Sequence, residues 1–313
     1  MDDRRIGGKQ PRVLVIAGVT ASGKTCASLK LADQLPIEIV SADSVSVYRG
    51  LDIGSAKPTP EQRDLVPHHL IDVADPDEPM SAALYAELAD DAISGILSRG
   101  RYPVLVGGTG LYIRAVLHGL MEGPEGDQEL RLRLKEKEDA CGRGTLHRDL
   151  CEVDPITAHR LHPFDQVRII RALEVYQRTG KPISSFQEKH QFSENRYDAM
   201  YLALDPGREI LNRRISARVE EMLDRGLLEE AAALRRRGFD SSLRSLRTPG
   251  YRQAFEVLDG KKTVEEAFES ICTDHRRYAR RQRVWFRSVS SVLFFNGPDE
   301  LNYTELADWL RKK

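Results

Sequence analysis

The sequence is poor in cysteine and contains no long hydrophobic run. Its four cysteines, Cys26, Cys141, Cys151 and Cys272, show no C-x-x-C spacing. We therefore expect neither a zinc site nor a disulfide framework, and a cytoplasmic protein. No apolar segment approaches the ~20 residues of a membrane span, and residues 1–8 lack the apolar stretch of a secretory signal. We expect no membrane association and no export.

Neither sign of charge dominates the chain, whose formal net charge is −1. The charges are unevenly distributed: residues 1–110 carry 11 basic and 15 acidic side chains, whereas residues 205–290 carry 19 and 14. The basic segment is a candidate surface for a large anion such as nucleic acid. A solvated helix surface would have the same composition, and charge alone does not distinguish the two.

One eight-residue run matches the phosphate-binding P-loop, G-x-x-x-x-G-K-[ST]. It consists of Gly18, Val19, Thr20, Ala21, Ser22, Gly23, Lys24 and Thr25. An apolar run precedes it and an amphipathic pattern over residues 26–35 follows, which is the strand–turn–helix context that the motif needs. Backbone N–H groups, the helix N-terminus and Lys24 would hold phosphate oxygens, and Thr25 would hold the accompanying Mg²⁺. We expect the chain to bind a di- or triphosphate.

Short apolar runs alternate with helical patterns, which indicates an α/β fold with a parallel sheet flanked by helices, as in P-loop NTPases. The expected strands are residues 13–17, 37–40, 69–73, 104–106, 200–204 and 292–295. From about residue 117 to residue 198 the chain is charged and helical, without convincing strands. We expect a P-loop core formed by residues 1–116 and 199–313, interrupted by a helical insertion domain at residues 117–198.

Two of the expected strands end in residues that bear on chemistry: the second strand ends at Asp43, and the fourth ends in Gly107-Gly108. The carboxyl ends of parallel strands border the ligand crevice, so Asp43 should face the ligand of the P-loop and could accept a proton or help to hold Mg²⁺. A turn aspartate is the plainer alternative. Motor ATPases end the fourth strand in an acidic residue. Glycine there argues against NTP hydrolysis and favours close approach of a substrate to the backbone.

A helical pattern over residues 264–288 presents four arginines on one face, Arg276, Arg280, Arg283 and Arg287. Such a row of guanidinium groups suits a phosphate backbone. We expect the neighbouring Trp285 and Phe286 to pack in the core rather than to stack on bases.

These motifs and their order resemble the tRNA dimethylallyltransferase (isopentenyl-diphosphate:tRNA transferase) family. Besides the P-loop, the matching runs are residues 41–44, 48–58, 67–72, 106–112, 171–175 and 250–253. The likeness extends from about Val13 to Arg287. One departure is Val19, where the family has proline. Since proline would only preset φ, we expect little effect on the chemistry.

The resemblance implies transfer of a dimethylallyl group from dimethylallyl diphosphate to the N6 amine of the adenosine 3′ to the anticodon, position 37, of tRNA. The diphosphate leaving group would lie in the P-loop with Mg²⁺ at Thr25. Asp43 would be the general base, and Thr20 would lie beside the diphosphate or the amine. Arg214 would bind the diphosphate, with Arg218 as the alternative.

The resemblance also implies two sets of tRNA contacts, because the adenine must leave its stack to reach a buried diphosphate. In the core they are Asp43, Ser44, Val45, Ser46, Thr109, Arg247, Thr248, Pro249, Gly250, Tyr251 and Arg252. In the insertion they are Asp127, Val167, Arg168, Ile169, Ile170 and Arg171. From the residues alone, Arg168 and Arg171 are equally surface charges. We expect a monomer that grips the anticodon stem-loop with its insertion.

Three other functions share parts of this pattern. A small-molecule kinase shares the P-loop and the aspartate after the second strand, but it needs no helical insertion. A prenyltransferase acting on free adenine nucleotide would lack an insertion of this length, and a P-loop RNA-binding module would not need the chemistry of Asp43. The missing acid after the fourth strand, with Asp43 and the basic half of the chain, favours a prenyl diphosphate over ATP as the ligand.

Overall fold

The computed structural model describes residues 10–121, 123–190 and 194–312, and the chain divides into two compact units. Unit 1 comprises the residues up to 117 and from 196 onward, and unit 2 comprises residues 118–195. Residues 1–9, on which the expectation of no secretory signal rests, lie outside the described residues. Along the described chain, no helix is both long and apolar enough to cross a membrane.

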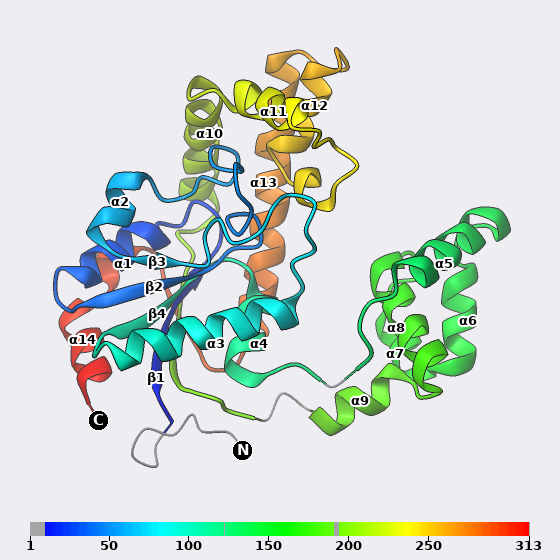
Figure 1. Ribbon diagram of the computed structural model, residues 1–313, viewed down its shortest axis with the longest axis horizontal. Helices are drawn as coiled ribbons and strands as arrows, with labels where there is room; N and C mark the ends of the chain where they lie inside the picture. The colour runs from blue at the N-terminus through cyan, green and yellow to red at the C-terminus, as the bar shows by residue number, and fades with distance from the viewer. Residues whose placement is uncertain (1–9, 122, 191–193, 313) are drawn as a thin grey trace. The chain divides into compact units, whose positions relative to one another are not determined.

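Unit 1 is built on a six-stranded parallel sheet with the order β3-β2-β4-β1-β5-β6 (Figure 1). The strands are β1 (Arg12–Gly18), β2 (Ile37–Ala42), β3 (His68–His69), β4 (Tyr102–Gly107), β5 (Asp198–Leu204) and β6 (Val292–Phe295). The register pairs both Ala17 and Ala42 with Gly107, and Gly18 with Leu204. The carboxyl ends of four strands therefore meet at one edge, where the loops that follow them can share a ligand.

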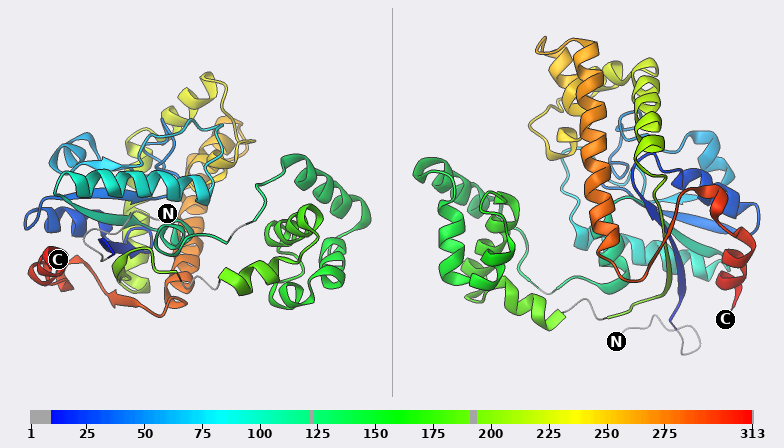
Figure 2. Two further views of the ribbon diagram at one scale, coloured as in Figure 1. Left: turned by 60° about the horizontal axis from the view of Figure 1, so that its bottom comes forward. Right: turned by 180° about the vertical axis from the view of Figure 1, so that it is seen from behind.

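Helices cover both faces of this sheet. The helices of unit 1 are α1 (Lys24–Ala32), α2 (Pro60–Leu65), α3 (Ala82–Ser98), α4 (Gly110–His118), α10 (Arg208–Asp224), α11 (Leu227–Arg236), α12 (Tyr251–Leu258), α13 (Val264–Arg287) and α14 (Tyr303–Arg311), with short 3-10 turns η1 (Arg244–Arg247) and η2 (Pro298–Glu300). Helices α1 and α14 pack on the face that presents Leu14, Ile16 and Leu202. The long α13 lies on the opposite face, where Phe286 meets Tyr201 edge to face, and it runs beside α10 (Figure 2).

Among its described residues, unit 2 has helices joined by loops and no strand, and it has a core of its own. Its helices are α5 (Gln128–Cys141), α6 (Thr145–Val153), α7 (Pro155–Arg160), α8 (Gln166–Thr179) and α9 (Ile183–His190). The core includes Leu130, Leu150, Ile169 and Leu173 from three of these helices. The amphipathic periodicity of the charged sequence is therefore sufficient to form a separate packed unit.

The expected strands and helices are confirmed in order and type, but one strand is much shorter than predicted. The strand expected over residues 69–73 is reduced to His68–His69. Leu70 and Asp72 have φ of 62° and 58°, which is outside the region that a β-strand can use. The first helix begins at Lys24, two residues before the predicted start, and ends at Ala32.

Candidate active site

The loop between β1 and α1 has a backbone suited to an anion. Gly18 and Gly23 have φ of 150° and 99°, and Ala21, at 58°, also adopts the left-handed region. A Cβ on Gly18 would lie 2.5 Å from the carbonyl oxygen of Leu204, so β5 leaves no room for a side chain there. Gly23 precedes α1, whose N-terminus has no side-chain cap. The first N–H groups of the helix are therefore left for a ligand.

Lys24 is folded back over this loop. Its Nζ donates to the carbonyl oxygens of Gly18 at 3.1 Å and Val19 at 2.8 Å. Burial and the neighbouring Arg218 lower the pKa of Lys24 to about 8, against the raising effect of Asp43. Phosphate oxygens could replace the two carbonyl acceptors, and their charge would favour the protonated ammonium.

Two arginines one turn apart on α10 approach the P-loop. Arg214 Nη1 donates to the carbonyl oxygen of Ser22 at 3.2 Å, and the rest of its side chain is exposed. Arg218 donates through Nη2 to the carbonyl oxygen of Ser55 at 3.2 Å, whereas its buried Nε has no hydrogen-bond partner among the described residues. Burial lowers the pKa of Arg218 and the charge of Asp43 opposes that shift, so the two groups are within electrostatic reach of each other. The geometry gives both arginines a place beside the loop.

Asp43 follows the last residue of β2 and has two roles available to it. Its Oδ1 accepts from the backbone N–H groups of Val45 at 2.8 Å and Ser46 at 3.2 Å, which is the role of a turn aspartate. Its Oδ2 has no hydrogen-bond partner among the described residues. The charge of Asp43 raises the pKa of Lys24 and opposes the lowering of the pKa of Arg218. One carboxylate thus shapes the turn and keeps an oxygen for a proton near the cations of the P-loop.

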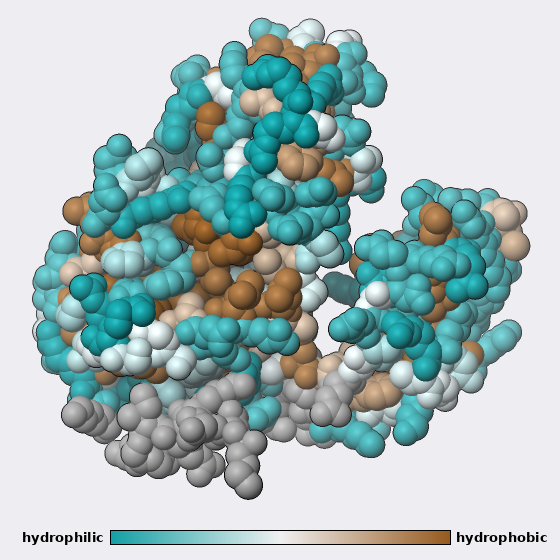
Figure 3. All heavy atoms as spheres, viewed as in Figure 1, coloured by the Kyte–Doolittle hydropathy of each residue, from teal (hydrophilic) through white to brown (hydrophobic). Residues whose placement is uncertain are grey.

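Aromatic side chains surround Asp43. The rings of Tyr85 and Tyr112 stack with their centroids 4.0 Å apart, and the Tyr85 hydroxyl donates to the carbonyl oxygen of Ser41 at 2.9 Å. Burial, with the charge of Asp43 adding to it, raises the pKa of Tyr278 to about 12. Apolar side chains gather in the middle of the face of unit 1 seen in Figure 3. These surroundings suit a phosphorylated ligand with an apolar substituent.

Gln282 of α13, which sequence reasoning missed, ties the P-loop to the loop after β4. Its Oε1 accepts from the N–H of Thr20 at 2.8 Å, and its Nε2 donates to the carbonyl oxygen of Gly108 at 2.9 Å, both in the interior. The N–H of Thr20 is therefore directed at α13 rather than at the ligand. The available signal was a glutamine among the arginines of residues 276–287.

The glycines that end β4 make room for protein atoms. A Cβ on Gly107, Gly108 or Gly110 would lie within 2.2 Å of an atom of Ala42, Gln282 or Trp285, respectively. The prediction that these glycines open the backbone to a substrate is therefore wrong. Their close contacts instead fix the loop after β4 against β2 and α13.

Five of the residues expected to contact tRNA lie together after β2 and β4. They are Asp43, Ser44, Val45, Ser46 and Thr109, and Thr109 Oγ1 accepts from the N–H of Ser44 at 3.0 Å. The N–H of Thr109 in turn donates to the carbonyl oxygen of Ala42 at 3.0 Å. The two loops therefore form one hydrogen-bonded surface beside the P-loop.

The second group of expected tRNA contacts in the core spans η1 and the start of α12. Some of its members are exposed and others are buried. Arg247 is exposed, and Thr248 and Pro249 are partly exposed. Gly250 and Tyr251 are buried, and the Tyr251 hydroxyl donates to Glu230 at 2.6 Å. Arg252 forms an ion pair with Asp274. The side chain of Tyr251 thus supports the fold rather than presenting a surface to RNA.

The expected contact residues of unit 2 are also divided between surface and interior. Val167 is 74% exposed and the Arg168 side chain 71% exposed, whereas Ile169 is buried and Ile170 partly buried. Arg168 forms an ion pair with Asp165 at 3.3 Å. Val167 and Arg168 are therefore the members of this group that are placed to touch another molecule.

Arg171 and Asp127 hold unit 2 together. Arg171 forms an ion pair of 2.5 Å with the fully buried Glu174 and donates to the carbonyl oxygen of Pro124 at 2.9 Å. Asp127 caps α5 by accepting from the N–H of Leu130 at 3.0 Å, and its own N–H donates to Glu174 at 2.7 Å. Both residues have structural partners that account for their presence.

The arginine row expected on α13 is interrupted. Arg276, Arg280 and Arg287 are exposed, but Arg283 makes a bidentate ion pair with Asp205 at 2.5 and 2.6 Å, which holds α13 to the end of β5. Phe286 is buried, and Trp285 is partly buried beneath the guanidinium of Arg114, 4.6 Å from the ring centroid. The prediction of core packing is confirmed for Phe286, whereas Trp285 is only partly buried.

The chemistry of the site suits a metal that arrives with its ligand. Among the described residues, no three His, Cys, Asp or Glu side chains are grouped to hold a metal ion. Thr25, in the first turn of α1, offers a hydroxyl beside the anion-binding N–H groups. Mg²⁺ commonly takes most of its ligands from phosphate and water, so the residues present fit Mg²⁺ bound to a diphosphate.

Comparison with known proteins agrees with this architecture. The profile of the family described as IPP transferase matches residues 46–289, and that of isopentenyl transferase matches residues 11–68. The chain is 49% identical over 290 residues to a tRNA dimethylallyltransferase of Anaeromyxobacter dehalogenans, covering 93% of this chain and 94% of the relative. It is 46% identical over 294 residues to tRNA dimethylallyltransferase 1 of Pelobacter propionicus, covering 94% and 95%.

Two solved structures are similar over almost the whole chain. One is the full-length tRNA isopentenylpyrophosphate transferase from Bacillus halodurans, with 39% identity, 96% of each chain covered and a TM-score of 0.69. The other is a eukaryotic dimethylallyltransferase acting on tRNA, with 27% identity, 96% of this chain and 75% of that chain covered, and a TM-score of 0.76.

Proposed function

Because the chain belongs to the IPP transferase family, we propose that it transfers a dimethylallyl group from dimethylallyl diphosphate to the N6 amine of the adenosine 3′ to the anticodon of tRNA, position 37. One observation carries this proposal. The P-loop and the free Oδ2 of Asp43 share one edge of the sheet, and β4 ends in glycine rather than in the acid of a motor ATPase. Phosphates bound in this P-loop are therefore suited to be a diphosphate leaving group rather than the phosphates of a hydrolysed nucleotide.

The P-loop binds the diphosphate through the N–H groups at the start of α1, Lys24, Arg214 and Arg218. Thr25 would hold the Mg²⁺, which when bound offsets the charge of the diphosphate. As the allylic C–O bond breaks, charge grows on the diphosphate oxygens, and these preorganised donors stabilise the transition state more than the ground state. Oδ2 of Asp43 accepts the proton that the adenine amine loses as its nitrogen bonds to the allylic carbon. Thr20, held by Gln282, keeps the loop in place beside both groups.

The tRNA contacts come from both units. The loops after β2 and β4, the exposed Arg247 and the surface of unit 2 at Val167 and Arg168 meet the anticodon stem-loop, and arginine suits its phosphates. The flipped adenine enters beside Asp43. We infer that the protein acts as a monomer in the cytoplasm, where its tRNA substrate is found.

The test uses three acceptors with dimethylallyl diphosphate and Mg²⁺: an anticodon stem-loop RNA with adenosine 3′ to the anticodon, the same RNA with guanosine there, and AMP. Digested RNA is analysed by mass spectrometry for the prenylated nucleoside. We expect one dimethylallyl group on the adenosine RNA and none on the other two. Modification of AMP but not RNA would indicate a nucleotide prenyltransferase, and RNA binding without modification would indicate a binding module.

Asp43→Asn tests the role of the base. The amide oxygen keeps the acceptor for Val45 and Ser46, so the turn is retained, whereas the proton acceptor is lost. We expect the single-turnover rate to fall by about 10²–10⁴-fold, with tRNA affinity nearly unchanged in a filter-binding assay. Collapse of tRNA binding would make Asp43 a structural residue.

A further inference from the structure

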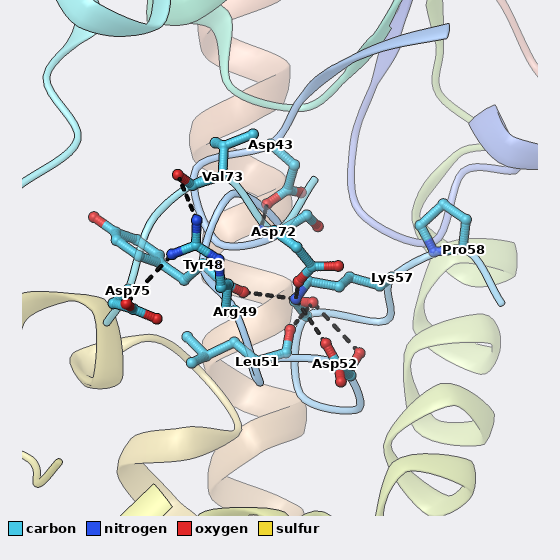
Figure 4. A network of polar contacts seen from close by, with 12 residues as sticks. Asp43, Tyr48, Arg49, Leu51, Asp52, Lys57, Pro58, Asp72, Val73 and Asp75 are labelled. Atoms are coloured by element: carbon cyan, nitrogen blue, oxygen red, sulfur yellow. Dashed lines mark hydrogen bonds and ion pairs between the residues drawn. The ribbon is translucent and has the colours of Figure 1, made fainter. Parts of the chain in front are cut away.

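Lys57 is a buried lysine outside the P-loop, and its ammonium has three acceptors (Figure 4). Nζ lies 2.6 Å from each of the carbonyl oxygen of Tyr48, Oδ1 of Asp52 and Oδ1 of Asp72. The side chain is only 2% exposed. Each of the three ammonium hydrogens thus has a partner, which a charge so deeply buried requires.

Asp72 connects Lys57 to the turn that contains Asp43. Its backbone N–H donates to the carbonyl oxygen of Ser46 at 3.2 Å, and the N–H of Ser46 donates to Oδ1 of Asp43 at 3.2 Å. The adjoining N–H groups of Val73 and Ala74 both donate to the carbonyl oxygen of Val47, at 2.8 and 3.0 Å. The segment after β3 is therefore hydrogen-bonded along the turn that Asp43 organises.

Asp72 needs such an anchor because its backbone is strained. Its φ of 58° is in the left-handed region, which non-glycine residues seldom adopt. Lys57 holds one of its carboxylate oxygens, and Arg63 holds the other at 2.9 Å. The Asp72 side chain is partly buried, which raises its pKa, but the hydrogen bonds and charges of Lys57 and Arg63 outweigh this and keep the pKa below its usual value.

We propose that Lys57 is a positioning residue for the transfer reaction: through Asp72 and Ser46 it fixes the turn that aims Oδ2 of Asp43. This inference rests on the proposed function, in which Asp43 is the base. It predicts a loss in the chemical step without a loss in binding. Lys57 itself is enclosed by protein atoms and has no ammonium hydrogen left for a substrate.

Asp52 and Asp72 provide a matched pair of variants. Each carboxylate accepts from Lys57 at 2.6 Å, so Asp52→Asn and Asp72→Asn both remove an ion pair with Lys57, and Asp72→Asn also removes the pair with Arg63. The Asp52 side chain, however, is 57% exposed, and its segment is held independently by Glu230, which accepts from the N–H groups of Asp52, Ile53 and Gly54 at 2.9–3.3 Å. Of these two aspartates, Asp72 is the one whose own N–H is hydrogen-bonded to the turn of Asp43, at the carbonyl oxygen of Ser46.

The experiment measures the single-turnover rate and the KM of both substrates for the unaltered chain and the variants, with thermal unfolding to check the fold. We expect Asp72→Asn, and Lys57→Met where it folds, to lower the rate about tenfold or more with KM within about twofold, as displaced catalytic groups do. Asp52→Asn should change neither by more than about twofold. Equal losses in Asp52→Asn and Asp72→Asn would overturn the proposal.

A double-mutant cycle separates positioning from general support of the fold. In an Asp43→Asn background there is no base to aim, so Asp72→Asn should lower the residual rate by no more than about twofold. The same fractional loss in both backgrounds would reduce Lys57 to a structural residue and contradict the proposal. Absence of transfer by the unaltered chain would instead refute the proposed function, so the two failures are distinct.

Discussion

The low pKa of Lys24 gives the diphosphate site a pH dependence that can be measured by ligand binding. Without a ligand, burial and Arg218 lower the pKa of Lys24 to about 8. A diphosphate in the loop would place negative charge beside the ammonium and raise that pKa again. Binding should therefore be linked to uptake of a proton by Lys24, and affinity should fall as the pH rises.

The size of the effect follows from the free-state pKa. Below pH 8 most Lys24 side chains are already charged, whereas above it the charged fraction falls tenfold for each pH unit. If the bound lysine stays charged, the donor's affinity falls about tenfold between about pH 7 and about pH 9, which corresponds to about 1.4 kcal/mol. The affinity should be nearly constant at lower pH.

Isothermal titration calorimetry with a non-hydrolysable thio analogue of dimethylallyl diphosphate measures this linkage. The last pKa of such a phosphate ester is about 6, so the ligand's own charge is constant over the range that matters. Titrations in buffers of different ionisation enthalpy count the protons taken up directly. Lys24→Met is the control, and its weaker binding should not vary with pH in this range. An unaltered chain whose affinity is flat to about pH 9, or a Lys24→Met variant with the same slope, would refute the reasoning.

Three further predictions concern residues whose surroundings are known only from the structure. Gln282→Leu removes two buried hydrogen bonds to backbone groups, and we expect it to lower the free energy of unfolding by about 2 kcal/mol in urea denaturation. An unchanged denaturation midpoint would show that these hydrogen bonds do not stabilise the fold. Glu174→Gln should lower the free energy of unfolding by about 3 kcal/mol, because it leaves Arg131 and Arg171 without their buried counter-charge. Burial raises the pKa of Glu174, but its hydrogen bonds outweigh this and the net shift is downward. The loss of unfolding free energy in Glu174→Gln should therefore be complete above about pH 4 and become smaller below it. A loss that does not depend on pH would contradict the role of the ion pairs. Arg168→Ala should weaken tRNA binding and reduce the salt slope by about one, and an unchanged slope would remove Arg168 from the interface.

Local patterns were enough to predict the core and the phosphate loop. The P-loop spacing specifies a strand, a turn and a helix in order, and the alternation of apolar runs with amphipathic patterns specifies the parallel sheet. The strand after His69 was overestimated because Leu70-Ile71 is apolar, and nothing in the sequence shows that Leu70 and Asp72 adopt positive φ. In that conformation Asp72 pairs with Lys57 and Arg63, which a local pattern does not show.

The surroundings that the sequence did not predict share one physical cause, which is pairing across the fold. Arg283 resembles its exposed neighbours in sequence, but β5 brings Asp205 to it. Arg171 likewise meets Pro124, 47 residues away, as well as its helix neighbour Glu174. Gly107 and Gly108 were interpreted as allowing close approach of a substrate, whereas the carbonyl of Ala42 lies against Gly107 and the side chain of Gln282 lies against Gly108. Such contacts depend on topology, which a local pattern does not contain.

The most direct test of the central claim asks which phosphate compound the P-loop consumes. Unmodified tRNA transcript is incubated with the protein and Mg²⁺, with either dimethylallyl diphosphate or ATP, and released diphosphate and modified adenosine are quantified together. The account predicts one diphosphate released for each dimethylallyl group gained by the tRNA, and no consumption of ATP. Transfer or hydrolysis of an ATP phosphate without prenylation of the tRNA would contradict it.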